Sequence, residues 1–326
     1  MAITKNEKNK KLDAAPTGEP MTAVTALRKL KNKAKYSMVY SRDGKPELPH
    51  GGVKYHLQGV SVYVGTARRR NRVILSTSAD KGKLIMGIAT PDKRHYTVEA
   101  EPIGYETEEK VHPGGIQVIG QYVVIPIYYK GYKGIEIRNI MDGLNIVKEF
   151  SIKNKPYCVG ITTTGENSSE YYVLAAVTKP DGSRVDVYTT EPGYKLSDSQ
   201  CTFTHFGSYR LKSNETRWNR YSNNISLLSD TDSNIYFLGF YNTDRVFGYG
   251  IDIADLHQME LKETNTVTFK RLGEFVAERK NGSFRFGAGA TVLNASSIQI
   301  YSCERNGQKD LSIGMDSIDC DLYHEW

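Results

Sequence analysis

The hydrophobic and polar positions along most of this chain alternate in short runs that are typical of β-strands. The clearest run is His112–Gly120 followed by Tyr122–Ile127, where a turn leads into an apolar strand, a glycine turn and a second strand. From Tyr36 onward, similar runs are separated by Gly, Asn, Asp and Lys, and the helical period disappears. The pattern predicts an all-β fold.

The opening of such a strand pair recurs five times, each time at a small residue. The aligned positions are Gly59, Gly115, Gly160, Asn224 and Gly289, which follow one another at intervals of 45 to 65 residues. A repeat of about 40–50 residues that supplies four strands is typical of a β-propeller blade, and the longer intervals require loop insertions. We therefore predict a single five-bladed β-propeller over residues 36–326.

Four strands can be assigned to every repeat except the last. The expected first strands are Val60–Val64, Ile116–Ile119, Ile161–Thr163, Ile225–Leu228 and Ala290–Leu293. In the fourth repeat, the third strand is expected at Val246–Ile251. The fifth repeat lacks a clear fourth strand, which either Cys320–Trp326 or Tyr36–Tyr40 could supply. We favour Tyr36–Tyr40, because a strand borrowed from the other terminus closes the ring and hides an edge.

Two other architectures compete with this prediction. A pair of β-sandwiches would also give many short strands, but it would not give five openings of one type. A six-bladed ring would need a sixth opening between Met1 and Tyr55, where the sequence shows none.

The N-terminal region differs in composition from the rest of the chain. Residues 1–20 are rich in Lys and Asn and end in Pro16–Pro20, which predicts a disordered tail. Residues 21–35 predict an amphipathic helix, since Ala23, Ala26, Leu27 and Leu30 share one face. We expect this helix to pack its apolar face on the propeller. A helix on a membrane surface is the alternative, but the apolar face is small.

Three runs carry a resemblance to a group of known proteins. His112–Gln117, Asn224–Asp230 and Phe286–Gly289 resemble segments of bacterial β-propeller proteins of unassigned function, and the likeness covers most of residues 50–305. The resemblance implies the fold and carries over no catalytic residue. Better-known five-bladed propellers include sugar-binding lectins of the tachylectin type and furanosidase-type glycoside hydrolases, and this sequence matches neither in motif detail.

Composition and charge narrow the classes of partner. The chain has 326 residues, of which 39% are hydrophobic and 25% charged, as in ordinary globular proteins. The net charge of +6 arises within the first 35 residues, so the predicted propeller is formally neutral. A neutral propeller lacks the basic stripe that a nucleic-acid groove needs, and we predict no nucleic-acid partner.

The cysteines and the terminus bear on the compartment. Cys158, Cys201, Cys303 and Cys320 form no Cys-x-x-Cys pair, which argues against a cysteine zinc site. The first residues do not resemble a secretory signal, and no run of about 18 apolar residues could span a membrane as a helix. We therefore expect a cytoplasmic protein with reduced thiols and no integral membrane association.

The candidate binding site follows from the repeat. In a propeller, the loops that enter the first strands line the mouth of the central channel. An aromatic or imidazole ring stands three residues before each aligned small residue: His56, His112, Tyr157, Tyr221 and Phe286. Polar side chains flank the same openings: Gln58, Arg220, Asn223 and Arg285. We predict that these nine residues form a ligand funnel, although rings that merely fill the channel neck would give the same pattern.

Two neighbouring loops are expected on the same face as the funnel. Tyr128–Lys133 and Tyr241–Arg245 connect second to third strands and carry aromatic, amide and guanidinium groups. Such groups suit sugars or flat organic molecules.

The same openings do not favour metal-dependent or hydrolytic chemistry. His56 and His112 would need a further ligand to hold zinc or iron, and no equivalent position supplies one, so we predict no metal or other cofactor. Glycoside hydrolysis normally needs two carboxylates across the scissile bond, whereas these openings carry His, Tyr and Phe. The chain also lacks a Gly-x-Ser-x-Gly elbow and a phosphate-binding Gly-Lys-Ser/Thr loop.

We therefore predict a ligand-binding or scaffold protein. Its ligand would be a small molecule or a glycan, and a glycan would make the protein lectin-like. A protein partner is a further option. The alternative is a metal-independent cyclase or isomerase. In that case His56 or His112 would act as acid or base, and the surrounding rings would stabilise developing positive charge.

Overall fold

A computed structural model describes most of the chain from Asn32 onward. The described residues are 32–40, 56–65, 72–78, 82–92, 95–99, 113–129, 131–165, 170–178, 184–211, 224–230, 232–243, 251–277, 283–294, 297–303, 308–310 and 315–324. The described part of the chain is all-β, with no helix among its elements. It therefore contains no helix that is long and apolar enough to cross a membrane.

Four sheets are antiparallel meanders of four consecutive strands. The first contains β2 (His56–Tyr63), β3 (Arg72–Ser78), β4 (Lys83–Asp92) and β5 (His95–Glu99). The second contains β6 (Gln117–Ile119), β7 (Tyr122–Tyr129), β8 (Tyr132–Asn139) and β9 (Asn145–Ser151). The third contains β10 (Pro156–Thr164), β11 (Tyr171–Thr178), β12 (Arg184–Thr189) and β13 (Thr204–Arg210). The fourth contains β14 (Asn224–Ser229), β15 (Ile235–Asn242), β16 (Asp252–Lys262) and β17 (Thr266–Ala277).

The fifth sheet combines both ends of the described chain. Its path is β1 (Asn32–Tyr40), β21 (Met315–His324), β19 (Ser297–Cys303) and β18 (Ser283–Asn294), with β20 (Gln308–Asp310) paired to β21. The pairing of β1 with β21 covers nine residues on each strand. Both candidate closing segments therefore contribute, since β21 extends the fifth sheet and β1 pairs along its outer edge.

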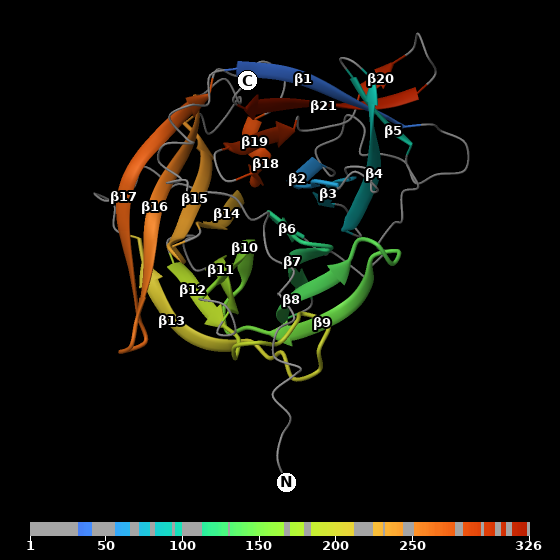
Figure 1. The fold of residues 1–326 in the computed structure, drawn as a ribbon. Coiled ribbons are helices and arrows are strands. Elements are labelled where there is room, and N and C mark those ends of the chain that lie inside the picture. The colour runs from blue at the N-terminus through green and yellow to red at the C-terminus, as the bar shows by residue number, and fades with distance from the viewer. Residues whose placement is uncertain are drawn as a thin grey trace.

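The sheets form a ring around a central axis, which is a β-propeller arrangement (Figure 1). The first strands of the five sheets are the innermost, and they contact one another in the order β2, β6, β10, β14 and β18, after which β18 contacts β2. The outer strands β9, β13 and β17 lie at the rim in Figure 1. Each predicted first strand coincides with or overlaps one of these innermost strands.

Three expectations need correction. Five equivalent four-stranded blades are not present, because four sheets are regular and the fifth is a composite of both termini. The predicted helix at residues 21–35 is wrong where it can be compared, since Asn32–Lys35 belong to β1; its other residues, and the predicted tail, lie outside the described residues. The third strand of the fourth sheet is Asp252–Lys262 rather than Val246–Ile251, of which only Ile251 is described.

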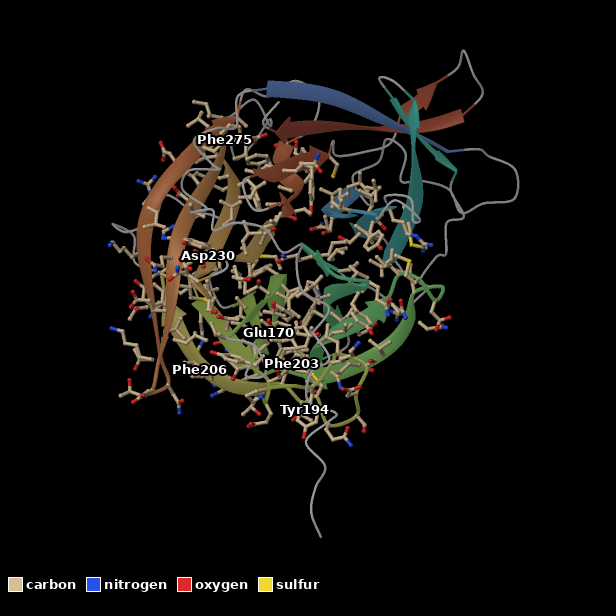
Figure 2. The ribbon with its side chains drawn as sticks, in the orientation of Figure 1. Glu170, Tyr194, Phe203, Phe206, Asp230 and Phe275 are labelled. Carbon is tan, nitrogen blue, oxygen red and sulfur yellow. The ribbon has the colours of Figure 1, made fainter. Side chains whose placement is uncertain are left out.

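The hydrophobic core lies between neighbouring sheets. One apolar cluster joins β6, β7 and β8 to β10, β11 and β12. Similar clusters lie between the first and second, the third and fourth, and the fourth and fifth sheets. Inner strands such as β11 are covered on both faces and are almost continuously buried, whereas the rim strands β9 and β13 are largely exposed. At the rim, Phe203 (labelled in Figure 2) stacks on Phe150 of the preceding sheet with ring centroids 5.0 Å apart. Burial of these faces supplies the main stabilising free energy of the ring.

Candidate functional site

The innermost strands approach one another closely because glycine occupies the contact points. The Gly115 N–H donates to the Tyr157 carbonyl at 3.2 Å, and the Val159 N–H donates to the Gly115 carbonyl at 3.0 Å. A Cβ atom at Gly114 would lie 1.5 Å from the Tyr157 carbonyl oxygen. The glycine pair in the His112–Gly120 run therefore allows the backbones of β6 and β10 to meet, beyond forming a turn.

A closed belt of hydrogen bonds surrounds the channel at one level. On each innermost strand, a backbone N–H donates to a side chain from another sheet, which is an adjacent sheet for every donor except Leu227. The five donor–acceptor pairs are Val62 with Tyr301 Oη (3.2 Å), Val118 with Ser61 Oγ (2.9 Å), Ile161 with Gln117 Oε1 (2.9 Å), Leu227 with Gln117 Oε1 (2.8 Å) and Ala290 with Ser226 Oγ (3.0 Å). The belt satisfies strand-edge groups that would otherwise lack partners in the interior.

Gln117 is the centre of this belt, because its amide connects three strands. Its Oε1 accepts from the backbone of β10 and β14, and its Nε2 donates to the Leu227 carbonyl at 2.8 Å. Nearby, Tyr301 Oη lies 3.0 Å from Thr291 Oγ1 and 3.3 Å from Ser61 Oγ. Burial raises the pKa of Tyr301, so this phenol stays neutral and can donate within the belt.

A cavity of about 450 Å³ lies in the channel beside the belt. All five innermost strands line it with the C-terminal parts of their sequences. The lining residues are Val62–Gly65 from β2 and beyond, Gln117–Gly120 from β6 and its turn, Ile161–Thr163 from β10, Leu227–Ser229 from β14 and Ala290–Val292 from β18. The cavity is within the range of small-molecule sites, ~300–1,000 Å³.

The described lining residues are uncharged and mixed in polarity. Valine, leucine and isoleucine side chains alternate with the hydroxyls of Thr162, Thr163, Ser229 and Thr291. Thr162 and Ser229 are hydrogen-bonded to each other at 2.9 Å. Among the residues described around the cavity, the phenol of Tyr63 is the only ionisable side chain. The cavity can therefore accept hydrogen-bonding groups without charge.

Backbone groups add to this lining. In an antiparallel pair, alternate residues direct their N–H and C=O groups away from the partner strand. Because Ile161, Leu227 and Ala290 donate inward to the belt, the residues two positions later also turn their backbone toward the channel. Those residues, Thr163, Ser229 and Val292, line the cavity. A ligand there would meet strand-edge donors and acceptors as well as hydroxyls.

The predicted funnel residues lie toward the other end of the same strands. Gln58, Tyr157, Arg285 and Phe286 precede the cavity-lining parts of β2, β10 and β18, and none of these four lines the cavity. All four are partly exposed, and the Arg285 guanidinium lies 5.6 Å from the centroid of the Phe286 ring. For His56 the structure describes only the backbone, and His112, Arg220, Tyr221 and Asn223 lie outside the described residues. The funnel stays a prediction.

The alignment behind the funnel needs one correction. Gly115 forms a parallel bridge with Cys158, so Cys158 rather than Gly160 stands at the equivalent height in β10. A register irregularity between Pro156 and Cys158 accompanies this shift, and Tyr157 is thus not the structural equivalent of His112. Tyr128, at the start of the Tyr128–Lys133 loop, contacts Lys155 just before β10, with the Lys155 Nζ 3.7 Å from the ring centroid; the position of this loop beside the funnel stays a prediction.

The sequence interpretation missed a set of buried carboxylates on the third strands. Glu136, Asp186 and Asp255 occupy equivalent positions, each one residue before the residue at which a register shift begins. Each is paired with an arginine: Glu136 with Arg138 at 2.7 Å, Asp186 with Arg184 at 2.6 Å and Asp255 with Arg271 at 2.8 Å. The repeated carboxylate–arginine pairs were hard to find in the sequence because the arginine has no fixed spacing. It lies two residues after Glu136, two residues before Asp186, and on the next strand for Asp255.

These carboxylates serve the fold. Asp186 accepts hydrogen bonds from Asn154, Thr178, Arg184 and Ser208, so both of its oxygens are engaged. Burial alone would raise the pKa of Asp186, but these hydrogen bonds outweigh burial and hold it below its usual value. No group of three metal-ligating side chains occurs within the described residues.

Comparison with known proteins gives no family and only distant structural similarity. No model of a known family and no curated protein matches the chain. Similar solved structures include a thermostable family-43 glycoside hydrolase (9% identity, TM-score 0.44, covering 84% of this chain and 92% of that one). The parainfluenza virus 5 haemagglutinin-neuraminidase is also similar (8% identity, TM-score 0.42, 88% and 80%). A third is the WD40 domain of SCAP from fission yeast (7% identity, TM-score 0.30, 84% and 73%). At these values the comparisons say nothing about the ligand.

Proposed function

We propose that this protein binds a neutral small molecule in the cavity at the centre of the propeller. The observation that carries the proposal is the cavity itself, about 450 Å³ in volume and walled by all five innermost strands. Concave sites of this size with apolar walls and a few fixed polar groups are the usual place for small ligands in proteins. In this proposal the composite fifth sheet acts as the fifth blade and completes the wall.

The lining favours a ligand that is uncharged and rich in hydroxyl or amide groups. Thr163 and Ser229 offer hydroxyls together with strand-edge backbone groups, while Val62, Val118 and Val292 offer apolar contact. Burying an unpaired charge in such a lining would cost several kcal/mol. A neutral sugar has both hydroxyls and apolar C–H faces, so a lectin-like function is the form of the proposal that we favour.

The proposal predicts that filling the cavity abolishes binding. Val118→Phe places a larger side chain on the cavity wall, and we expect it to weaken binding of a neutral monosaccharide or N-acetylated sugar at least about tenfold. Val276→Phe is the matched control, because Val276 lies on rim strand β17 with 52% of its surface exposed. Native mass spectrometry and calorimetry with D-glucose, N-acetyl-D-glucosamine and their charged counterparts D-gluconate and D-glucosamine would measure both effects.

Each outcome of this test is informative. Val292→Phe, from a different strand of the same wall, repeats the experiment if Val118→Phe fails to fold. Binding that is equal in the cavity and rim variants would place the ligand elsewhere, and tighter binding of the charged sugars would contradict the ligand class. If neither a glycan array nor a metabolite extract yields a ligand that depends on Val118, the proposal fails.

The funnel at the other end of the strands remains a second proposed contact surface, carried by the sequence pattern alone. The alternative function, a metal-independent cyclase or isomerase with His56 or His112 as acid or base, also remains a prediction. Turnover of a metabolite that is lost in His112→Ala would support it.

A further inference from the structure

Two of the four cysteines lie opposite each other at the point where the ring is closed. In the pairing of β19 with β21, Cys303 is the direct partner of Cys320. Cys303 lies on the strand before β20 and Cys320 on the strand after it, and the two residues come together only in the folded sheet. The other two cysteines have no such arrangement, because Cys158 stands opposite Val177 and Cys201 lies outside the strands.

The register gives this pair a Cα spacing that a disulfide allows, and the Cys303 side chain would turn from its position beside Gly287 to form the bond. The Ala290 N–H donates to Ser226, away from β19, so Ala290 and Ile300 form a non-hydrogen-bonded pair. The backbone N–H and C=O groups of Ile300 therefore point toward β21, so Ile300 and Tyr323 form a hydrogen-bonded pair. Hydrogen-bonded and non-hydrogen-bonded pairs alternate along this unbroken register, which makes Cys303 and Cys320, three residues further on, a non-hydrogen-bonded pair. Opposite residues of this kind have Cα atoms about 4.5 Å apart, within the range of about 4.4–6.8 Å found for disulfides.

The pairing of β19 with β21 also attaches the strands from both ends of the described chain to the rest of the fifth sheet. The pairing of β21 with β1 covers nine residues on each strand, but only four residue pairs, Ile300–Cys303 with Tyr323–Cys320, attach β21 to β19. A ribbon of two long strands is thus held to the innermost part of its sheet by a short connection. Local opening of this connection is the step that would expose the buried Cys303 to reagents.

We infer that Cys303 and Cys320 form a disulfide under oxidising conditions and that this bond holds β21 to β19 in the fifth sheet. With glutathione disulfide as oxidant, one cysteine thiolate attacks a glutathione sulfur and releases one glutathione thiolate. The second cysteine thiolate then attacks the cysteine sulfur of the mixed disulfide and releases the second glutathione. Two protein thiols are oxidised, one glutathione disulfide is reduced to two thiols, and two protons leave the protein.

The bond would turn the four-pair attachment into a covalent one. It closes a loop that contains β20 and the first part of β21, so it restricts the unfolded chain and holds β21 against β19. In a reducing compartment the pair stays as two thiols and the closure depends on the ladder alone. The stability of the ring therefore depends on the redox state.

The test is oxidation of the purified full-length protein, followed by alkylation and peptide mapping. After treatment with glutathione disulfide, we expect a linked peptide pair containing Cys303 and Cys320, lighter than the reduced pair by two hydrogen atoms. Cys158 and Cys201 should remain thiols, and burial raises the pKa of Cys201 to about 11, which keeps its thiolate scarce at neutral pH. For a loop of this size, the midpoint of thermal unfolding should rise on the order of 5 °C.

Matched variants separate the bond from general effects of oxidation. In Cys320→Ser the difference in midpoint between oxidised and reduced protein should disappear, whereas in Cys201→Ser it should persist. Because each variant is compared with itself, a loss of stability from the substitution cancels. Recovery of Cys303 and Cys320 as separately alkylated residues after oxidation of folded wild-type protein would overturn the inference, as would a linkage between any other two cysteines.

Discussion

Gly114 is the residue at which the contact between innermost strands is tightest. An alanine methyl group at this position would meet the Tyr157 carbonyl oxygen at 1.5 Å, so the backbones of β6 and β10 would have to separate. We expect Gly114→Ala to lower the free energy of unfolding by about 3 kcal/mol. Gly273→Ala is the matched control, because a Cβ there meets nothing within 4 Å and should change stability by less than about 1 kcal/mol. Urea unfolding measures both, and equal midpoints would contradict the account.

Single residues also show what the sequence could and could not predict. The small residues that open the first strands were found from their recurrence, and the structure explains Gly59, and Gly114 next to the aligned Gly115, by close approach of neighbouring backbones. Their equivalence was misjudged at Gly160, since Gly115 is bridged to Cys158, two residues earlier, and an irregularity between Pro156 and Cys158 adds one residue to β10. Such a shift leaves no periodic signal, because the apolar pattern continues on both sides of it.

At the scale of the element, the buried carboxylates fix the third strands to their surroundings. Asp186 joins β12 to Ser208 of β13, to Thr178 of β11 and to Asn154 of the preceding blade connection. We expect Asp186→Asn to lower the free energy of unfolding by about 2–4 kcal/mol, because donors arranged around a carboxylate lose their charged acceptor. Asp232→Asn, in an exposed turn, should change it by less than about 0.5 kcal/mol. Chemical denaturation of both variants at pH 7 tests the difference.

The same residue gives a dependence on pH whose sign follows from its lowered pKa. The contribution of ionised Asp186 is complete above the pKa of the unfolded chain, about 3.9, and disappears as the pH falls through the lower value in the folded protein. Wild-type protein should therefore lose more stability between pH 5 and pH 2 than Asp186→Asn does. An identical loss in the two proteins would show that Asp186 is not the group responsible.

Elements were predicted well where hydrophobic alternation decides them. The first strands and the meander of four strands follow from patterns that the chain displays locally, whereas the sequence offered the two termini as alternatives and the structure uses both. The strand at Asn32–Lys35 was misjudged as helix because a lysine-rich segment with few apolar residues has no strand signal of its own, and its pairing with β21 decides the outcome. The long β16 was misplaced for a related reason, since its polar residues Asp252, Asp255 and His257 are buried by partners elsewhere in the fold.

At the scale of the whole molecule, the convergence of distant segments could be predicted from the sequence, whereas the position of the cavity could not. Repeat symmetry correctly indicated that distant segments converge on one axis, and the cavity lies on that axis. Its location along the axis depends on the belt, which is made by side chains as different as Gln117, Ser61 and Tyr301. Three of the acceptors, on Ser61, Gln117 and Ser226, stand two residues after aligned small residues. Their side chains differ, however, and Tyr301 comes from another strand, so the repeat alone does not identify the acceptors.

Closure of the ring gives the last prediction, which concerns the whole molecule. Removing residues 1–40 deletes β1 and leaves the edge of β21 without its nine-residue partner, with only the four pairs to β19 and the short β20 pairing to hold it. We expect this truncated protein to unfold at lower temperature and to associate at rising concentration, because an open strand edge pairs with other chains. Removing residues 1–31 keeps β1 and should preserve both the midpoint and the monomer–oligomer distribution of the full chain. Thermal unfolding and sedimentation in the presence of a reductant measure these effects free of any Cys303–Cys320 bond, and equal behaviour of the two truncations would show that β1 contributes nothing to closing the propeller.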